Sequence, residues 1–357
     1  MAKLGEVCLL KAGKFVSAND ISPEYNKGLY PCFGGNGIRG YVADYTHDGE
    51  FPLIGRQGAL CGNVNLASGK FHATEHAVVV QPKIEMNVHW LYYALNAMNL
   101  GQYATGAAQP GLAVSKLETL SIEIPNISEQ NKIAQTLYKV EQLVNFRKQQ
   151  LAKLDELVKA RFVETSKEWQ AVPGQLNEFL EDITYGFTNP MPDAEEGPWK
   201  VTAKDVVNGH INILTARKTT NEAFERLTNK SKPRKGDVLL TKDGTLGRVA
   251  VVDVENLCVN QSVAVMRCNN KIYPEFLAMI LQMPEYQRKL LEDSGGGTIK
   301  HLYITKVDKM LISVPDLVIQ KELLVFAKRV EQQKQTVQQS LEKLELMKKA
   351  LMQEYFG

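Results

Sequence analysis

Two histidines and a glutamate stand close together in the segment His72-Ala73-Thr74-Glu75-His76, which fits the H-x-x-E-H pattern of one class of zinc proteases. That chemistry needs a helix, because only a helix places both imidazoles on one face beside the glutamate. Here FHATEHAVVVQP alternates and ends in three valines, so the pattern favours a strand. A third ligand is not evident, and we expect no metal site.

The stretch GNGIRG, residues 35–40, fits G-x-G-x-x-G, which in dinucleotide-binding proteins follows a strand and opens a helix. YPCF precedes it, and Tyr41, Val42 and Tyr45 follow and favour a strand. We therefore expect a tight loop between two strands, with Arg39 at its tip. The sequence also lacks a Walker motif, a G-x-S-x-G elbow and a D-P-P-Y segment. It indicates no catalytic residue, no enzyme activity and no cofactor.

Composition is that of an ordinary globular protein of two or three domains, with 357 residues and a formal net charge of +2. No apolar run approaches the ~20 residues of a membrane span, and no secretion signal is visible. The five cysteines are scattered without a C-x-x-C pair. Reduced thiols and a cytoplasmic location are the simplest interpretation.

The sequence repeats itself at a distance of 190 residues. Segments 121–164 and 311–354 align without a gap and are identical at 13 of 44 positions, including Pro125 with Pro315 and Gln130 with Gln320. Shared helical composition is the alternative, but the common register and the matching proline favour an internal duplication.

Each repeat predicts a long helix that begins after its proline. Apolar residues recur at alternating steps of four and three, a heptad seam that is interrupted at Arg147, Lys334 and Lys348. About 36 residues would give a helix of roughly 54 Å. We expect the two seams to bury each other rather than to pack only on neighbouring domains. The seam residues are Ile133, Leu137, Val140, Val144, Leu151 and Leu154 in the first repeat, and Leu323, Val330, Val337, Leu341 and Leu344 in the second.

The blocks before each helix are rich in glycine, β-branched and aromatic residues and predict strands with glycine turns. Each block closes with a helix followed by a glycine-rich loop. The expected fold class is α+β, with two β-rich α/β domains separated by two long helices packed as an antiparallel coiled coil. We place the parts at residues 1–123, 124–168, 169–313 and 314–357.

The glycine loops of both blocks carry side chains that suit DNA. Arginine and lysine recognise guanine edges and phosphates, whereas asparagine and glutamine recognise adenine. Ordinary exposed turns are the alternative for any single residue, but the two clusters together favour binding. The candidates are Arg39, Tyr41, Arg56, Gln57 and Asn63 in the first block, and Lys242, Arg248, Asn260, Gln261, Lys300 and His301 in the second.

A direct repeat in sequence, joined by antiparallel helices, would place the two domains about a pseudo-twofold axis. Two such domains could contact half-sites on one face of DNA, which are about 34–36 Å apart or a multiple of that. The domains differ in sequence, so the half-sites should differ too.

These features resemble the specificity (S) subunit, HsdS, of type I restriction–modification systems. The resemblance rests on YPCFGGNGIRGYV and IGRQGALCGNV in the first block, and on KGDVLLTKDGTLGRVAVV and NQSVAV in the second. The two linkers, IPNISEQNKIAQTLYKVEQLVNFRKQQLAKLDEL and VPDLVIQKELLVFAKRVEQQ, resemble the conserved regions of the family. The second departs from the pattern, because Ile319 stands where the first has Glu129.

The resemblance implies a non-catalytic subunit whose two target-recognition domains each recognise half of a bipartite, asymmetric double-stranded DNA site. It implies that the helices set the spacer and dock two methyltransferase (M) subunits, which hold S-adenosylmethionine, and that restriction (R) subunits join them. Three alternatives remain: a non-catalytic coiled-coil scaffold with two β-rich protein-binding domains, a fused adenine methyltransferase, and a metalloprotease based on His72 and His76.

Overall fold

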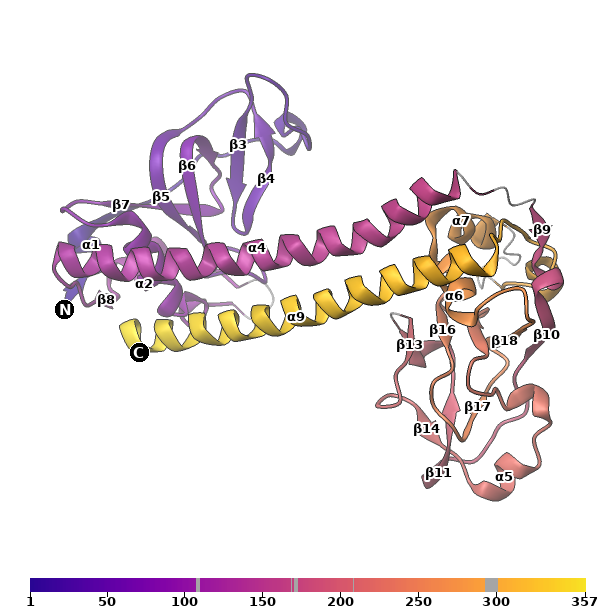
Figure 1. Cartoon of the computed structure of the whole chain (residues 1–357). Coiled ribbons are helices and arrows are strands. Elements are labelled where there is room, and N and C mark those ends of the chain that lie inside the picture. The colour runs from indigo at the N-terminus through magenta and orange to yellow at the C-terminus, as the bar shows by residue number, and fades with distance from the viewer. Residues whose placement is uncertain (107–109, 168, 170–172, 208, 293–300) are drawn as a thin grey trace. The chain divides into compact units, whose positions relative to one another are not determined.

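The computed structural model describes residues 1–106, 110–167, 169, 173–207, 209–292 and 301–357. The chain divides into two compact units, and Figure 1 labels their elements. Unit 1 comprises Met1–Leu151 with Thr336–Gly357, and unit 2 comprises Ala152–Gln335. Each unit therefore contains one β-rich domain and parts of both long helices. Below, the first and second domains are the parts of units 1 and 2 outside those helices.

The first domain is built on a curled six-stranded sheet of order β2-β7-β5-β6-β3-β4. Phe33, Leu53, Phe71 and Val79 meet inside the curl, and the helix α2 packs in a second, larger core. Its elements are β1 (Ala2–Lys3), α1 (Leu4–Val7), β2 (Cys8–Ala12), β3 (Tyr30–Gly34), β4 (Gly37–Val42), β5 (His47–Gly55), β6 (Val64–Ala73), β7 (Ala77–Pro82), α2 (Val88–Ala97), α3 (Val114–Glu118) and β8 (Ser121–Ile122).

The second domain repeats this plan with a four-stranded sheet of order β10-β18-β15-β16. Its elements are β9 (Gly174–Gln175), β10 (Leu180–Tyr185), β11 (Ala194–Val201), β12 (Val206–Val207), β13 (His210–Ile211), β14 (Arg217–Lys218), α5 (Asn221–Glu225), β15 (Val238–Thr241), β16 (Val249–Val251), β17 (Leu257–Val259), β18 (Val263–Cys268), α6 (Pro274–Gln282), α7 (Pro284–Glu292), α8 (Ile304–Val307) and β19 (Leu311–Ile312).

The structure corrects two expectations about these elements. The helix expected at the end of the second block is two helices, because Pro284 cannot continue α6 and begins α7 instead. The segment with the two histidines is not one strand, since β6 ends at Ala73 and a turn leads into β7 at Ala77.

The two long helices are α4 (Ile127–Ser166) and α9 (Leu317–Phe356), each of 40 residues rather than about 36. Both begin two residues after their prolines, as expected, and side-chain oxygens cap their first turns. Asn126 Oδ1 accepts the amide of Glu129 at 3.0 Å, and Asp316 Oδ1 accepts the amide of Ile319 at 3.0 Å.

The antiparallel pairing of the two helices is confirmed inside each unit. In unit 1, Lys348 Nζ lies 2.6 Å from Glu141 Oε1, and Arg147 Nε donates to Ser340 Oγ at 3.1 Å. In unit 2, Lys334 Nζ lies 2.7 Å from Asp155 Oδ1. The three residues that interrupt the heptad seams therefore make polar contacts with the opposite helix.

Only part of each seam packs against the other helix. Ile133 and Leu137 lie in the core of the first domain, and Leu323 lies in the core of the second, so each helix is first anchored on the domain that precedes it. Burial follows the seam, with eight residues buried and three half-buried. The buried ones are Ile133, Leu137, Val140, Val144, Leu323, Val330, Val337 and Leu341, and the half-buried ones are Leu151, Leu154 and Leu344.

The identical Pro and Gln residues of the repeat have a structural reason. Gln130 is 2% exposed, and it joins the start of α4 to the start of α2. Its Nε2 donates to the carbonyl of Pro125 at 2.8 Å, and its Oε1 accepts the amide of Asn87 at 2.9 Å. Gln320 does the same in the second domain, with the carbonyl of Pro315 and the amide of Tyr273.

Candidate nucleic-acid interface

Three loops of the first domain meet at one end of its sheet. They are the β3–β4 turn, the β5–β6 loop and the β6–β7 turn. A Cβ on Gly55 would lie 2.0 Å from the carbonyl oxygen of Gly35, so this approach requires glycine. The amide of Arg56 donates to the carbonyl of His76 at 3.0 Å, and Asn63 Nδ2 donates to Asn36 Oδ1 at 2.9 Å. The glycines of the G-x-G-x-x-G stretch thus bring loops together and open no helix.

The side chains of the two arginines of this loop cluster, Arg39 and Arg56, have no hydrogen-bond or ion-pair partner within the described part of the chain. Arg39 is exposed, but it lies on β4 and not at a loop tip as expected, because the turn before it occupies only residues 35 and 36. Its side chain passes over Gly34, where an added Cβ would lie 2.5 Å from Arg39 Cδ. Arg56 is half-buried, and its Nε is buried without a partner.

The other candidates of the first domain differ in exposure. Gln57 and Asn63 are exposed. Tyr41 is half-buried on β4, and its ring packs edge-on against Tyr25, with centroids 5.4 Å apart. The cluster therefore offers two guanidinium groups and the exposed amides of Gln57 and Asn63, which suit phosphates and base edges.

The corresponding cations of the second domain already have partners. Lys242 Nζ lies 2.9 Å from Asp243 Oδ2 and 5.5 Å from the centre of the Tyr185 ring. Asp243 Oδ1 also pairs with His301 Nδ1. Arg248 Nη1 donates to the carbonyl of Val206 at 3.3 Å. Binding DNA phosphates here would require these contacts to be exchanged.

Asp243 is held ionised by this cluster. Burial acts to raise the pKa of its carboxyl, but the hydrogen bonds from His301 and Lys242 outweigh it and hold the pKa below its usual value.

The remaining candidates of the second domain divide into two kinds. Asn260 Oδ1 accepts the amide of Ser262 at 3.2 Å and shapes its own turn, whereas Gln261 is exposed. Lys300 lies outside the described residues.

The two loop clusters share one backbone frame. The amide of Arg56 donates to His76 O, and the amide of Lys242 donates to Ser262 O at 2.9 Å. The amide of Leu112 donates to Arg56 O at 2.8 Å, and that of Leu302 donates to Lys242 O at 2.9 Å. Arg56 and Lys242 are therefore equivalent positions. The separation here is 186 residues, so the repeat of 190 does not align them.

The histidines of the H-x-x-E-H segment do not converge on a common point. His72 is buried, and its Nε2 lies 3.2 Å from the carbonyl oxygen of Lys14. His76 Nε2 instead lies 3.1 Å from Glu75 Oε1. Among the residues that the structure describes, no group of three histidine, cysteine or acidic side chains is placed to hold a metal ion.

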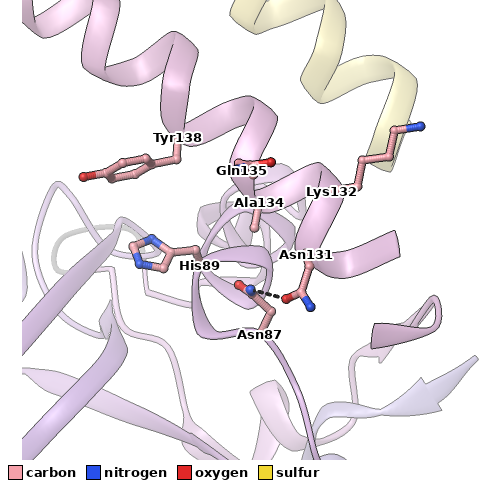
Figure 2. Close-up of a pocket in the computed structure, with 7 residues that line it drawn as sticks. All are labelled: Asn87, His89, Asn131, Lys132, Ala134, Gln135 and Tyr138. Carbon is pink, nitrogen blue, oxygen red and sulfur yellow. Dashed lines mark hydrogen bonds between the residues drawn. The ribbon is translucent and has the colours of Figure 1, made fainter. Parts of the chain in front are cut away.

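A polar groove that the sequence did not reveal lies in unit 1, between the start of α2 and α4 (Figure 2). Asn87 Nδ2 donates to Asn131 Oδ1 at 2.7 Å, and the rings of His89 and Tyr138 pack edge to face at 5.5 Å. Further along α4, Leu143 is 46% and Phe146 is 59% exposed. The groove and these apolar side chains form a surface, here called the α4 surface, that suits a protein partner. Its groove is lined by Asn87, His89, Asn131, Lys132, Ala134, Gln135 and Tyr138.

All five cysteines are free, and Cys8, Cys32, Cys61 and Cys258 are buried. Burial raises the pKa of Cys8 and Cys258 to about 11, so these thiols stay protonated at neutral pH. Within the described ranges, no helix is long and apolar enough to cross a membrane.

Comparison with known proteins identifies a family. A family model for the type I restriction modification DNA specificity domain matches residues 1–156 and 191–346. The specificity subunit of the Escherichia coli type I restriction enzyme EcoprrI is 53% identical over 143 residues, which are 40% of this chain and 36% of that protein. A Haemophilus influenzae protein named as a type I restriction enzyme specificity subunit is 28% identical over 319 residues, 85% of this chain and 80% of its own.

A solved structure shares the fold. The S subunit of a type I restriction–modification system from M. genitalium matches with a TM-score of 0.61 at 18% sequence identity. The match covers 99% of this chain and 95% of that one.

Proposed function

Because the chain belongs to the family of the type I restriction modification DNA specificity domain, we propose that it is the DNA-recognition subunit of such a system. Each of its two domains recognises one half of a bipartite, asymmetric double-stranded DNA site. The observation that carries this is the shared loop frame, which presents different side chains in the two domains. Arg56 and Gln57 occupy it in the first, and Lys242 and Asp243 in the second. One backbone with two sets of side chains suits two different half-sites.

Replacing Arg56 with alanine tests this proposal. The loss of a free guanidinium should weaken binding to the first half-site and reduce the salt dependence of binding, with recognition of the second half-site unchanged. Binding of the assembled complex to DNA with one half-site altered at a time measures both. An equal loss at both half-sites would contradict separate recognition. Arg161→Ala, an exposed arginine on α4, is the matched control.

The chain itself performs no chemistry under this proposal. The sequence has no D-P-P-Y segment, so S-adenosylmethionine and the methyl transfer belong to two partner methyltransferase subunits, and cleavage to restriction subunits. Such a complex acts on DNA in the cytoplasm. A coiled-coil scaffold with protein-binding domains is not favoured, because the family model matches both repeats.

The α4 surface is the proposed contact with a methyltransferase subunit. Exposed apolar side chains beside a polar groove have the composition of a protein interface. Phe146→Asp should reduce binding of the methyltransferase subunit at least tenfold, measured by calorimetry with the purified partner. Asn145→Asp adds the same charge at a neighbouring exposed position and should bind normally. Equal binding by both variants would exclude this surface.

The paired helices α4 and α9 are proposed to set the spacer between the half-sites. Their ion pairs fix which turns of the two helices face each other, for example at Glu141 and Lys348. A fixed register gives a fixed length, because an α-helix rises about 1.5 Å per residue.

A further inference from the structure

The β6–β7 turn of the first domain has a counterpart in the second. The amide of Ala77 donates to Thr74 O at 3.0 Å, and the amide of Val263 donates to Asn260 O at 3.1 Å. The turns also attach alike to the neighbouring strand, because Thr74 N donates to Phe33 O and Asn260 N donates to Val201 O. Thr74, Glu75 and His76 are therefore equivalent to Asn260, Gln261 and Ser262.

Only the middle position of this turn is at least partly exposed in both domains and has no side-chain hydrogen-bond or ion-pair partner outside the turn among the described residues; Glu75 pairs with His76 inside the turn, at 3.1 Å. At the first position, Thr74 is 0% exposed, and Asn260 hydrogen-bonds within its own turn. At the third, Ser262 Oγ accepts the amide of Ala203 at 3.0 Å. In the middle, Gln261 is exposed and the Glu75 side chain is 34% exposed.

The middle position lies directly beside the cation of the loop cluster. The next residue in each turn accepts the amide hydrogen of Arg56 or Lys242. The middle residue and that cation are therefore neighbours in the loop cluster. In the first domain, Glu75 is the one acidic residue in the sequence of the loop segments 34–39, 55–63, 74–76 and 110–112.

A carboxylate in such a cluster has a specific consequence for DNA binding. It repels phosphates, so it weakens binding to DNA of any sequence. It favours binding only where it accepts a hydrogen bond from a base, and cytosine N4 is the usual donor for glutamate. Glutamine both donates and accepts, and therefore matches adenine. In the free chain Glu75 Oε1 pairs with His76 Nε2 at 3.1 Å, and Oε2 is buried without a hydrogen-bond partner, so the side chain must rotate outward to accept from a base.

We propose that the middle residue of this turn determines specificity in both domains, with Glu75 accepting from a cytosine amino group and Gln261 pairing with an adenine. The inference rests on the proposed function, since it names bases for the same DNA interface. It adds Glu75, which the sequence alone did not select, and gives Gln261 a defined role.

The test exchanges the two side chains in the full complex with its methyltransferase subunits. Glu75→Gln should change the preferred base at one position of the first half-site from cytosine to adenine, by about tenfold or more, with the second half-site unchanged. Gln261→Glu should make the reverse change in the second half-site only. Selection of bound sites from a randomised DNA pool measures both, and the second variant keeps the test valid if the first fails to fold.

Glu85→Gln is the matched control, because it removes the same charge from an exposed residue beyond the far end of β7. Unchanged preferences in both folded exchange variants would overturn the inference, as would an equal effect of Glu85→Gln. If the wild-type complex selects no bipartite site at all, the proposed function fails instead. The two failures are therefore distinguishable.

Discussion

The buried glutamines at the starts of α4 and α9 should be the most sensitive polar residues in the two units. Replacing Gln130 with alanine removes one acceptor and one donor, and it leaves the amide of Asn87 and the carbonyl of Pro125 without partners. Gln320 makes three such bonds, because its Nε2 also donates to Lys271 O at 2.9 Å. Since Gln130 is 2% and Gln320 is 0% exposed, water cannot replace these bonds without rearrangement.

The expected size follows from the number of groups left unpaired. Each buried group that loses its partner costs roughly 1–3 kcal/mol. Gln130→Ala leaves two groups unpaired and should therefore lower the free energy of unfolding by about 2–6 kcal/mol, and Gln320→Ala, with three, by roughly 1–3 kcal/mol more. For a unit of this size, the first loss corresponds to a decrease in melting temperature of roughly 4–24 °C.

Differential scanning calorimetry of the two variants measures this, because each should lower the transition of its own unit. Gln149→Ala, at an exposed position on α4, should change the melting temperature by less than about 2 °C. The reasoning is refuted if Gln130→Ala and Gln149→Ala melt at the same temperature.

Three further predictions concern the helices and the second loop cluster. Inserting seven residues after Val144 and seven after Leu344 preserves the pairing of the two helices. Because a heptad adds roughly 10.5 Å, the accepted DNA spacer should lengthen by about three base pairs. Methylation of DNA sites with varied spacers measures this, and an unchanged spacer would contradict it. Lys348→Met breaks a partly exposed pair with Glu141 and should cost at most about 1 kcal/mol in urea unfolding; a loss above about 3 kcal/mol would show that the pair is effectively buried. The pKa of Asp243 is lower in the folded than in the unfolded chain, so its contribution to stability is present above pH ~4 and is lost as the pH falls through the folded pKa. Asp243→Asn should therefore destabilise unit 2 more at pH 7 than at pH 3, and an equal loss at both pH values would contradict this linkage.

Much of the fold follows from local sequence patterns. The heptad seams and the prolines at 125 and 315 predict two long helices and an internal repeat, because these signals lie within one element. Pro284 also marks the break between α6 and α7 in the sequence, because proline cannot continue a helix. It would have predicted two helices in place of one.

The candidate site was harder to predict from the sequence, because it depends on which distant strands pair. Glu75 belongs to the loop cluster only because the β6–β7 turn attaches to Arg56, nineteen residues earlier in the sequence. The repeat of 190 residues also does not extend to the loops at Arg56 and Glu75. Gln261 corresponds to Glu75 at a separation of 186, so ungapped alignment misses their equivalence.

The ion pairing of the two equivalent cations was equally difficult to predict from the sequence. Arg56 and Lys242 are equivalent and carry the same charge, yet only Lys242 has an ion-pair partner, in Asp243, among the described residues. The residue that follows the cation decides this, with Gln57 in one loop and Asp243 in the other.

The central claim is that one chain recognises two different DNA half-sites at a fixed spacing. The most direct measurement is a map of methylated adenines in the genomes of cells with and without this gene, in the presence of the partner methyltransferase. The account predicts the loss of methylation from one bipartite, asymmetric motif with a spacer of constant length. Methylation at a single continuous or palindromic motif, or no change in any motif while the partner is active, would contradict it.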